Sequence, residues 1–318
     1  MTEPLLEVEG LDVSFGAARE PLAAVEDFTL TVAKGEIVGI VGESGSGKSV
    51  AMLACMGLVD APGRVDARRM RFAGVDLRTL PARARRDATR RIGMIFQDPN
   101  TSLDPSYTVG AQIRETLRVH YDLSRAAAHG RALELLAQVE IPDPASRLQA
   151  YPFQLSGGTC QRVMIALALA GDPALLIADE PTTALDVTIQ AQILALLRRL
   201  QESRGMSLIL ITHDLAVLAQ LAGRVLVMYA GQVVEQAPID ELLRHPRHPY
   251  TNALLASIPE RHRGQARLPS LPGTLPGRYA RPAGCLLAPR CPQAQPGCSA
   301  AVPPLAGAVR CFHPIERA

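Results

Sequence analysis

Short, continuously apolar stretches alternate with helical periodicity over residues 1 to about 240. This alternation is typical of an α/β domain with a largely parallel core sheet. The stretches that predict buried strands are Glu36–Val41, Arg91–Gln97, Leu175–Asp179, Ser207–Thr212 and Arg224–Tyr229. Leu5–Phe15 and Phe28–Val32 alternate apolar and polar residues, which predicts a small antiparallel sheet. Helical periodicity from Gly110 to Val139 predicts an inserted helical subdomain at about residues 100–170.

The character of the chain changes after about residue 258. Eleven of the 25 prolines lie from Pro259 onward, which disfavours regular secondary structure there. The same stretch holds four of the six cysteines. We therefore predict a first domain over residues 1–240 and a C-terminal extension over residues 241–318.

Composition and charge narrow the class of protein. The 318 residues are 47% hydrophobic and 20% charged, which is typical of a globular chain. A net charge of +2 does not predict an extended positively charged surface, so nucleic acid is not an expected partner. The first residues do not resemble a signal peptide, and no apolar run is long enough to span a bilayer. We expect a cytoplasmic protein that serves any membrane process through partner chains, with its cysteines in a reducing compartment.

A glycine-rich segment, GESGSGKS, lies between a predicted strand and a predicted helix at Lys48–Leu58. This context favours a phosphate-binding loop over a glycine-rich turn without function. The glycines let backbone N–H groups face a phosphate, and the helix N-terminus adds partial positive charge. Lys48 can reach the β- and γ-phosphates, and the Ser49 hydroxyl can bind Mg²⁺. The predicted nucleotide-binding residues are Gly42, Ser44, Gly45, Ser46, Gly47, Lys48 and Ser49.

Polar residues follow three of the predicted strands. The apolar stretch before Asp179 and Glu180 predicts Asp179 as a Mg²⁺ ligand and Glu180 as the base that accepts a proton from water. Gln97 can contact both Mg²⁺ and a mobile segment beyond it. His213 can sense the γ-phosphate, because polar residues at the carboxyl edge of a parallel sheet face the ligand. The simpler alternatives are that Asp179 and Glu180 form a solvated acidic strand end, that Gln97 is a surface residue and that His213 is structural.

A second glycine-rich segment, Leu155-Ser156-Gly157-Gly158, precedes another apolar helix. A serine that caps a helix start makes a second anion site. One ATP does not need both loops from one chain. Two copies arranged head to tail would instead give two sites, each sandwiched between loops of different subunits.

The order of these segments, with Ala184-Leu185-Asp186 and Thr212-His213-Asp214, resembles the nucleotide-binding domain of ABC ATPases over about residues 1–240. The resemblance implies that Ser156 and Gly158 contact the γ-phosphate bound by the partner's phosphate loop. It also implies that Asp186 is an interface residue and that Phe15 stacks on adenine. Thr159 stands where the family usually has Gln or Met.

Further segments resemble the dipeptide/oligopeptide (and nickel) importer branch in particular, and the extension at 241–318 resembles that branch's C-terminal region. They are Phe96–Asn100, Ser102–Pro105, Asp179–Thr188 and His248–Thr251. The resemblance implies an ATP-hydrolysing subunit that powers peptide import, peripheral on the cytoplasmic face of the inner membrane. Its expected partners are two transmembrane permease subunits, a second ABC ATPase subunit, identical or homologous, and indirectly an extracytoplasmic solute-binding protein. Phe153 stands where the branch commonly has His, in a stretch expected to face the permease.

Two alternatives remain open at this stage. One is an ATPase subunit of a nickel or other small-solute importer. The other, from a different class, is an ABC ATPase of DNA repair or translation, although no long coiled coil or second ATPase domain is visible.

The tail cysteines, Cys285, Cys291, Cys298 and Cys311, are separated by five, six and twelve residues. Four thiols in a proline-rich cytosolic segment predict a bound metal that cross-links and stabilises this segment. Structural zinc usually needs a Cys-x-x-Cys pair, which is absent, so we predict a four-iron–four-sulfur cluster, with zinc or free thiols as alternatives. Cys55 and Cys160 are expected to be ordinary buried residues.

Overall fold

The structure is a computed structural model that describes residues 3–16, 21–183, 185–258, 269, 271–277 and 281–316. It divides into two compact units. The first contains Met1–Ala33, Ile37–Arg85 and Leu210–Ala318, and the second contains Lys34–Glu36 and Arg86–Ile209. Ala184 and the proline at 259, which entered the predictions above, lie outside the described residues. Within the described ranges, no helix is both long and apolar enough to cross a membrane.

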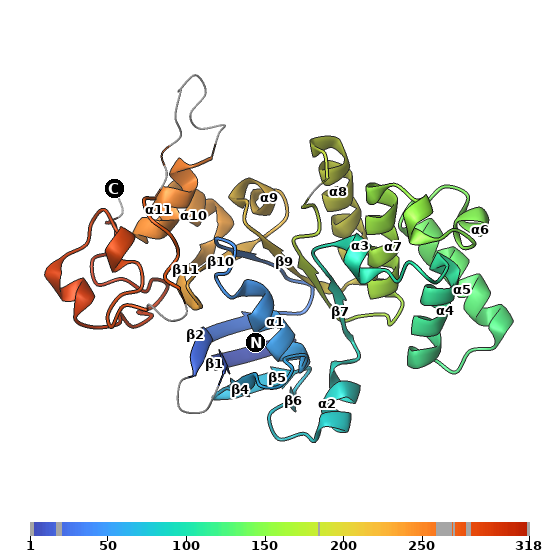
Figure 1. The fold of residues 1–318 in the computed structure, drawn as a ribbon, viewed down its shortest axis with the longest axis horizontal. Coiled ribbons are helices and arrows are strands. Elements are labelled where there is room, and N and C mark those ends of the chain that lie inside the picture. The colour runs from blue at the N-terminus through green and yellow to red at the C-terminus, as the bar shows by residue number, and fades with distance from the viewer. Residues whose placement is uncertain are drawn as a thin grey trace. The chain divides into compact units, whose positions relative to one another are not determined.

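The predicted antiparallel sheet is present in the first unit (Figure 1). Its central strand β1 (Leu6–Phe15) pairs with β2 (Leu22–Val32), β4 (Arg64–Asp66) and β5 (Arg69–Phe72), and β5 pairs with β6 (Val75–Asp76). The alternation of β1 places Leu6, Val8, Leu11 and Val13 in the core. Strand β2 begins earlier than predicted, and β4 to β6 are too short to leave a periodic pattern.

The first unit also contains a second group of strands. Strand β10 (Arg224–Tyr229) pairs in parallel with β3 (Ile37–Val41) and antiparallel with β11 (Gln232–Pro238). Strands β3 and β10 are mostly apolar without alternation because both of their faces are buried. The helices of this unit are α1 (Lys48–Met56), α9 (Leu215–Ala219), α10 (Ile239–Arg244) and α11 (Pro249–Ala256).

The second unit pairs β7 (Ile92–Ile95) with β8 (Leu175–Asp179) in parallel and adds the predicted helical region. Serine, threonine and aspartate side chains cap three of its long helices by accepting backbone N–H bonds. Its helical elements are α3 (Pro99–Ser102), α4 (Val109–His120), α5 (Arg125–Gln138), α6 (Pro144–Arg147), η1 (Pro152–Gln154), α7 (Gly157–Leu169) and α8 (Val187–Arg204). The chain passes between the units within α2 (Ala82–Thr89) and β9 (Ser207–Thr212).

The tail, defined as the described residues after 258, contains no helix or strand except two short 3-10 turns, η3 (Ala288–Arg290) and η4 (Pro296–Ser299), as its prolines predict. It is held against β11 by backbone bonds, including Arg310 N to Val234 O at 2.8 Å. The buried Arg310 side chain donates to Val233 O at 3.0 Å and to Asp27 Oδ2 at 2.9 Å. The tail is therefore part of the first unit, and the predicted domain boundary at residue 240 stays a prediction.

Candidate functional site

The glycine-rich segment GESGSGKS connects β3 to α1, as predicted, and two of its glycines are sterically required. A Cβ on Gly42 would lie 2.2 Å from the carbonyl oxygen of Met228. Gly47, the residue before α1, has a φ of 96°, and a Cβ there would lie 2.6 Å from Ala24 O. Only glycine allows the backbone to turn this closely, so the loop can present its N–H groups to a phosphate.

Lys48 is buried and folds back over the loop. Its Nζ donates to Gly42 O at 2.8 Å, to Glu43 O at 2.9 Å and to Ser46 Oγ at 3.4 Å. An ammonium group held among loop oxygen atoms can exchange them for phosphate oxygens without entering an apolar environment. Ser44 and Gly45 are exposed, while Ser46 is fully buried.

Two further predicted residues belong to the same unit. Phe15 is the half-buried last residue of β1, and its ring lies against Gly63, where a Cβ would be 2.9 Å from Phe15 Cε1. His213 is exposed directly after β9. Its neighbour Asp214 caps α9 by accepting the Ala216 N–H at 2.8 Å, which fixes the backbone where His213 leaves the strand.

In the second unit, Glu180 is bound by two other side chains. Its Oε2 accepts the Gln97 amide at 3.1 Å and the Thr183 hydroxyl at 2.9 Å. Glu180 has a φ of 47°, a left-handed conformation that residues other than glycine rarely adopt. Such strain clusters at functional sites because surrounding bonds must maintain it. The structure therefore brings together the predicted base and Gln97, and it adds Thr183, which the sequence did not indicate.

Asp179 is the last residue of β8 and is 6% exposed. A carboxylate is rarely buried to this extent unless it is paired or binds a cation. It precedes Glu180 directly, so β8 presents two carboxylates in succession, as the sequence predicts.

The second glycine-rich segment begins α7. Ser156 caps this helix by accepting the Thr159 N–H at 3.3 Å, and its hydroxyl shares a 2.8 Å hydrogen bond with the Thr159 hydroxyl. Gly157 and Gly158 form the first turn, where a Cβ on Gly158 would lie 3.0 Å from Ile189 Cγ2. The unusual Thr159 thus holds the Ser156 hydroxyl, a role that the sequence did not reveal.

Asp186 is exposed and caps α8, because its Oδ1 accepts the Ile189 N–H at 2.9 Å. Ile189 is the residue that lies beside Gly158. The cap therefore places Asp186 near the start of α7 and on the surface. Both positions suit the predicted role at a subunit interface.

All four tail cysteines are free thiols and line one cavity in the first unit, together with His248 and His313. Burial raises the pKa of the Cys285, Cys291 and Cys311 thiols. The cavity volume is about 20 Å³, room for roughly one water molecule. Within the described residues, no group of three or more His, Cys, Asp or Glu side chains could hold a metal ion. Cys55 and Cys160 are buried, as expected.

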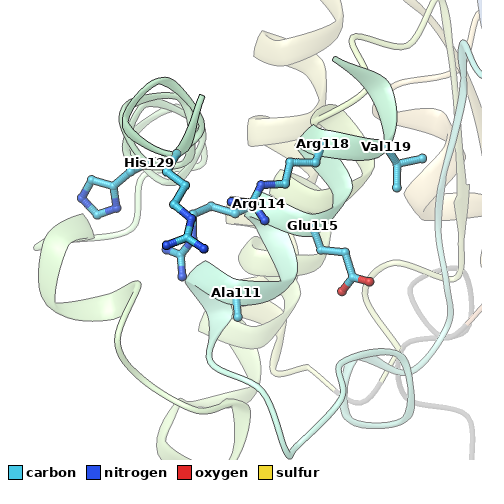
Figure 2. Close-up of a pocket in the computed structure, with 7 residues that line it drawn as sticks. Ala111, Arg114, Glu115, Arg118, Val119 and His129 are labelled. Atoms are coloured by element: carbon cyan, nitrogen blue, oxygen red, sulfur yellow. The ribbon is translucent and has the colours of Figure 1, made fainter. Parts of the chain in front are cut away.

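A larger hollow, of about 730 Å³, lies between α4 and α5. It contains none of the predicted site residues, and its walls are mainly basic. It is lined by Ala111, Arg114, Glu115, Arg118, Val119, Arg125 and His129. Figure 2 shows Glu115 pointing away from Arg114 and Arg118. This charge favours an anionic over an apolar partner, and the lining residues are all distinct from the predicted nucleotide residues.

Comparison with known proteins identifies the family of this chain. The family model for the ABC transporter matches residues 25–183, and the model for the oligopeptide/dipeptide transporter C-terminal region matches residues 234–298. The dipeptide transport ATP-binding protein DppD of Haemophilus influenzae is 55% identical over 98% of this chain and 96% of its own length. The Escherichia coli protein of the same name is 54% identical over 99% of this chain and 98% of its own length.

Solved structures show the same fold. The dimeric ATP-binding cassette MJ0796, described as a post-hydrolysis state bound to ADP and Pi, matches with a TM-score of 0.65 and 30% identity. It covers 74% of this chain and 98% of its own chain. CbiO1 of Clostridium perfringens, part of the ABC transporter complex cbiONQ, also has a TM-score of 0.65, at 26% identity, over 77% of this chain and 92% of its own. The chain therefore belongs to the ABC transporter family, as an ATP-binding subunit with the C-terminal region of its oligopeptide/dipeptide branch.

Proposed function

We propose that this chain hydrolyses ATP to power the import of dipeptides or oligopeptides. The observation that supports it most is the Glu180 carboxylate, which follows β8 directly and accepts hydrogen bonds from Gln97 and Thr183. The substrate class rests on relatives named as dipeptide transport ATP-binding proteins, 54–55% identical along almost their whole length. Such a subunit works at the cytoplasmic face of the inner membrane.

The phosphate loop binds the triphosphate. Lys48 exchanges its bonds to Gly42 O and Glu43 O for the β- and γ-phosphate oxygens. Phe15 stacks on the adenine. Mg²⁺, held by Ser49, Asp179 and Gln97, would neutralise phosphate charge, and these hydroxyl, carboxylate and amide oxygens are the ligands that this ion prefers.

Glu180 acts as the general base. A water attacks the γ-phosphorus, Glu180 accepts its proton, and the bond to ADP breaks, releasing ADP and phosphate. The bonds from Gln97 and Thr183 keep the carboxylate in place without neutralising it. Lys48 and His213 stabilise the charge that develops on the phosphoryl group.

A second ATPase subunit completes each site. Ser156, Gly157 and Gly158 at the start of α7 contact the γ-phosphate bound by the other subunit, and Asp186 lies in the same interface. The support for this contact comes from the start of α7 in this chain. A helix N-terminus with exposed polar groups and a capping serine is suited to bind an anion.

The movement of the ATPase subunits that accompanies ATP binding and hydrolysis is transmitted to two permease subunits through the helical region. Phe153 is 72% exposed and stacks on Tyr151, with ring centroids 5.5 Å apart. An exposed aromatic pair of this kind is typical of a contact surface. Solute reaches the permease through an extracytoplasmic binding protein, which this subunit does not contact.

A substitution at the second loop tests the shared site. In the complex purified with its membrane subunits, Ser156→Arg should abolish ATP hydrolysis while this chain still binds a photoreactive ATP analogue. Unaltered hydrolysis would contradict the head-to-tail arrangement. Loss of labelling would instead show that Ser156 supports the fold of its own unit.

We also propose that Cys285, Cys291, Cys298 and Cys311 hold a four-iron–four-sulfur cluster. The comparisons give no support for it, and no group of three or more His, Cys, Asp or Glu side chains in the described residues is arranged to hold a metal ion. The proposal rests on four free thiols that line one cavity and would have to move closer together. Such thiols must lose their protons to bind metal, and the small cavity must widen.

Anaerobic purification tests the cluster. We expect broad absorbance near ~400 nm and about four irons per chain, lost in Cys291→Ser and kept in Cys160→Ala. One zinc per chain, or neither metal, would overturn the cluster.

A further inference from the structure

Glu43, the second residue of the phosphate loop, is held by three of its groups. Its backbone N–H donates to the Tyr250 hydroxyl at 2.9 Å, and its carbonyl accepts from Lys48 Nζ at 2.9 Å. Its carboxylate accepts from Arg290 Nη1, at 3.1 Å to Oε2 and 3.3 Å to Oε1. The Lys48 contact lies within the loop itself, as does the Ser46 N–H bond to the same carbonyl at 3.1 Å, whereas the contacts with Tyr250 and Arg290 fix the loop from outside.

Arg290 lies in the cysteine-bearing tail, 247 residues from Glu43. Its side chain is 8% exposed, against 32% for Glu43. It also donates to the Tyr229 hydroxyl at 3.3 Å and to Pro272 O at 2.9 Å, and it lies 5.7 Å from the centroid of the Tyr229 ring. The contacts with Glu43, the Tyr229 hydroxyl, the Tyr229 ring and Pro272 O fix the position of this guanidinium, whose hydrogen-bond donors lie in one plane.

Tyr229 and Tyr250 connect the contacts of Glu43 and Arg290 to the core of the first unit. Tyr229 ends β10 and Tyr250 lies in the first turn of α11. Both are almost completely buried, and their rings meet edge to face with centroids 4.7 Å apart. Buried tyrosine hydroxyls need partners, and here the partners are the Arg290 side chain and the Glu43 backbone. The rigid β10 and α11 therefore carry the contacts that reach the loop.

A second tail segment lies beside the same loop. A Cβ on Gly45 would be 3.8 Å from Leu275 Cδ2, and the carbonyl that Arg290 binds belongs to Pro272 in the same segment. Leu275 and Arg290, from the same part of the chain, thus both lie next to the loop.

We propose that Arg290 is a positioning residue for ATP binding, which holds Glu43 and thereby keeps the phosphate loop in the conformation that receives the triphosphate. Arg290 acts through Glu43 and the loop backbone, and it does not touch the nucleotide itself. Without it, Glu43 would lose its charge partner, and the carbonyl that Lys48 binds would move. The inference rests on the proposed function in one respect, that this loop binds ATP.

The predicted signature is a change in KM without a matching change in kcat. In the intact transporter complex, Arg290→Ala should raise the KM for ATP about tenfold, because charged hydrogen bonds to the loop are lost. The kcat should change less than twofold, since the Glu180 machinery is untouched. Arg290→Lys should reverse part of the rise in KM, because lysine restores the positive charge but not the planar set of guanidinium donors.

Three further variants make the test specific. Glu43→Gln should raise the KM similarly, and the double variant Arg290→Ala/Glu43→Gln should be no worse than either single one. Arg310→Ala is the matched control, because Arg310 is an equally buried tail arginine that binds Asp27 and Val233 instead of the loop. Its KM for ATP should stay within twofold of the parent.

The outcomes separate this inference from the proposed function. Unchanged KM in both Arg290→Ala and Glu43→Gln, with a Lys48→Ala complex inactive, would overturn the role of Arg290 alone. Equal effects of Arg290→Ala and Arg310→Ala would also overturn it, by showing general loss of tail structure. Full activity in Lys48→Ala would contradict the ATP site itself.

Discussion

The Gln97 amide donates a 3.1 Å hydrogen bond to Glu180, although 83 residues separate them in the chain. Glu180 Oε2 also accepts the Thr183 hydroxyl, so one oxygen of the carboxylate has two donors. Any displacement of Gln97 must therefore move the Glu180 carboxylate or break this bond. If Glu180 is the base, as proposed, this contact is a direct physical route by which the helical region beyond Gln97 controls hydrolysis.

Replacing Glu180 by Gln tests the base. The amide keeps the size of the carboxylate but cannot accept the proton, so turnover should fall at least about a hundredfold. ATP binding should persist, because the phosphate loop is unaltered. Phosphate release and nucleotide binding measure the two effects, with the exposed Glu202→Gln as control. Turnover within tenfold of the parent would assign the base elsewhere.

Removing the donors of Glu180 should have a smaller effect. Thr183→Val deletes one hydrogen bond with little change in volume, and kcat should fall about threefold to tenfold with KM for ATP nearly constant. Gln97→Ala should lower kcat similarly and also weaken the response to solute. Steady-state kinetics of the complex provides both values. A rise in KM without a fall in kcat would show that these residues bind nucleotide rather than position Glu180.

The glycines of the chain should differ in their tolerance of alanine. Gly42→Ala forces a Cβ to 2.2 Å from Met228 O, so we expect a loss of about 1–3 kcal/mol in unfolding free energy. Gly130, inside α5, has open space where a methyl group would lie, with no atom within 4 Å, and Gly130→Ala should stabilise by about 0.5–1 kcal/mol. Urea unfolding of both variants measures this. Equal stability of the two would refute the steric argument.

His248 should make stability depend on pH. It is buried, its Nδ1 accepts the Tyr250 N–H at 3.1 Å, and burial lowers its pKa from 6.5 to about 4. Between these values the unfolded chain binds a proton that the folded chain does not. Stability is therefore full above about pH 6.5 and is lost as pH falls toward 4, by up to about 3 kcal/mol from this group.

The His248→Asn variant isolates this contribution. Asparagine keeps an acceptor at the start of α11 but does not titrate. The slope of unfolding free energy between pH 6.5 and 4 should decrease by about one proton. An unchanged slope would assign the pH dependence to other groups.

The strands with continuous apolar sequence were predicted most accurately. Leu175–Asp179, Ser207–Thr212 and Arg224–Tyr229 match β8, β9 and β10 at both ends. The strand predicted at Arg91–Gln97 is shorter, Ile92–Ile95, because the chain leaves the strand at Phe96, which is 43% exposed, and bends at Gln97. The helical stretch from 110 to 139 contains a break, since Ser124 caps a new helix. Local patterns fix element type better than element ends.

The residues around the predicted site were less accessible to sequence reasoning. Lys48, Glu180 and Ser156 were predicted because their neighbours form recognisable segments. The contacts of Glu43 with Arg290 and Tyr250 join positions more than 200 residues apart and leave no periodic signal. The left-handed backbone of Glu180 is likewise not indicated by its residue type, because residues other than glycine rarely adopt it.

ATP hydrolysis by the complex, reconstituted with its membrane and solute-binding subunits, tests the central claim most directly. Short peptides should stimulate hydrolysis, and the complex carrying Glu180→Gln should show neither basal nor stimulated turnover. Hydrolysis that ignores peptides but responds to nickel or another small solute would contradict peptide import while preserving the ATPase assignment. Turnover that persists in Glu180→Gln would contradict the mechanism itself.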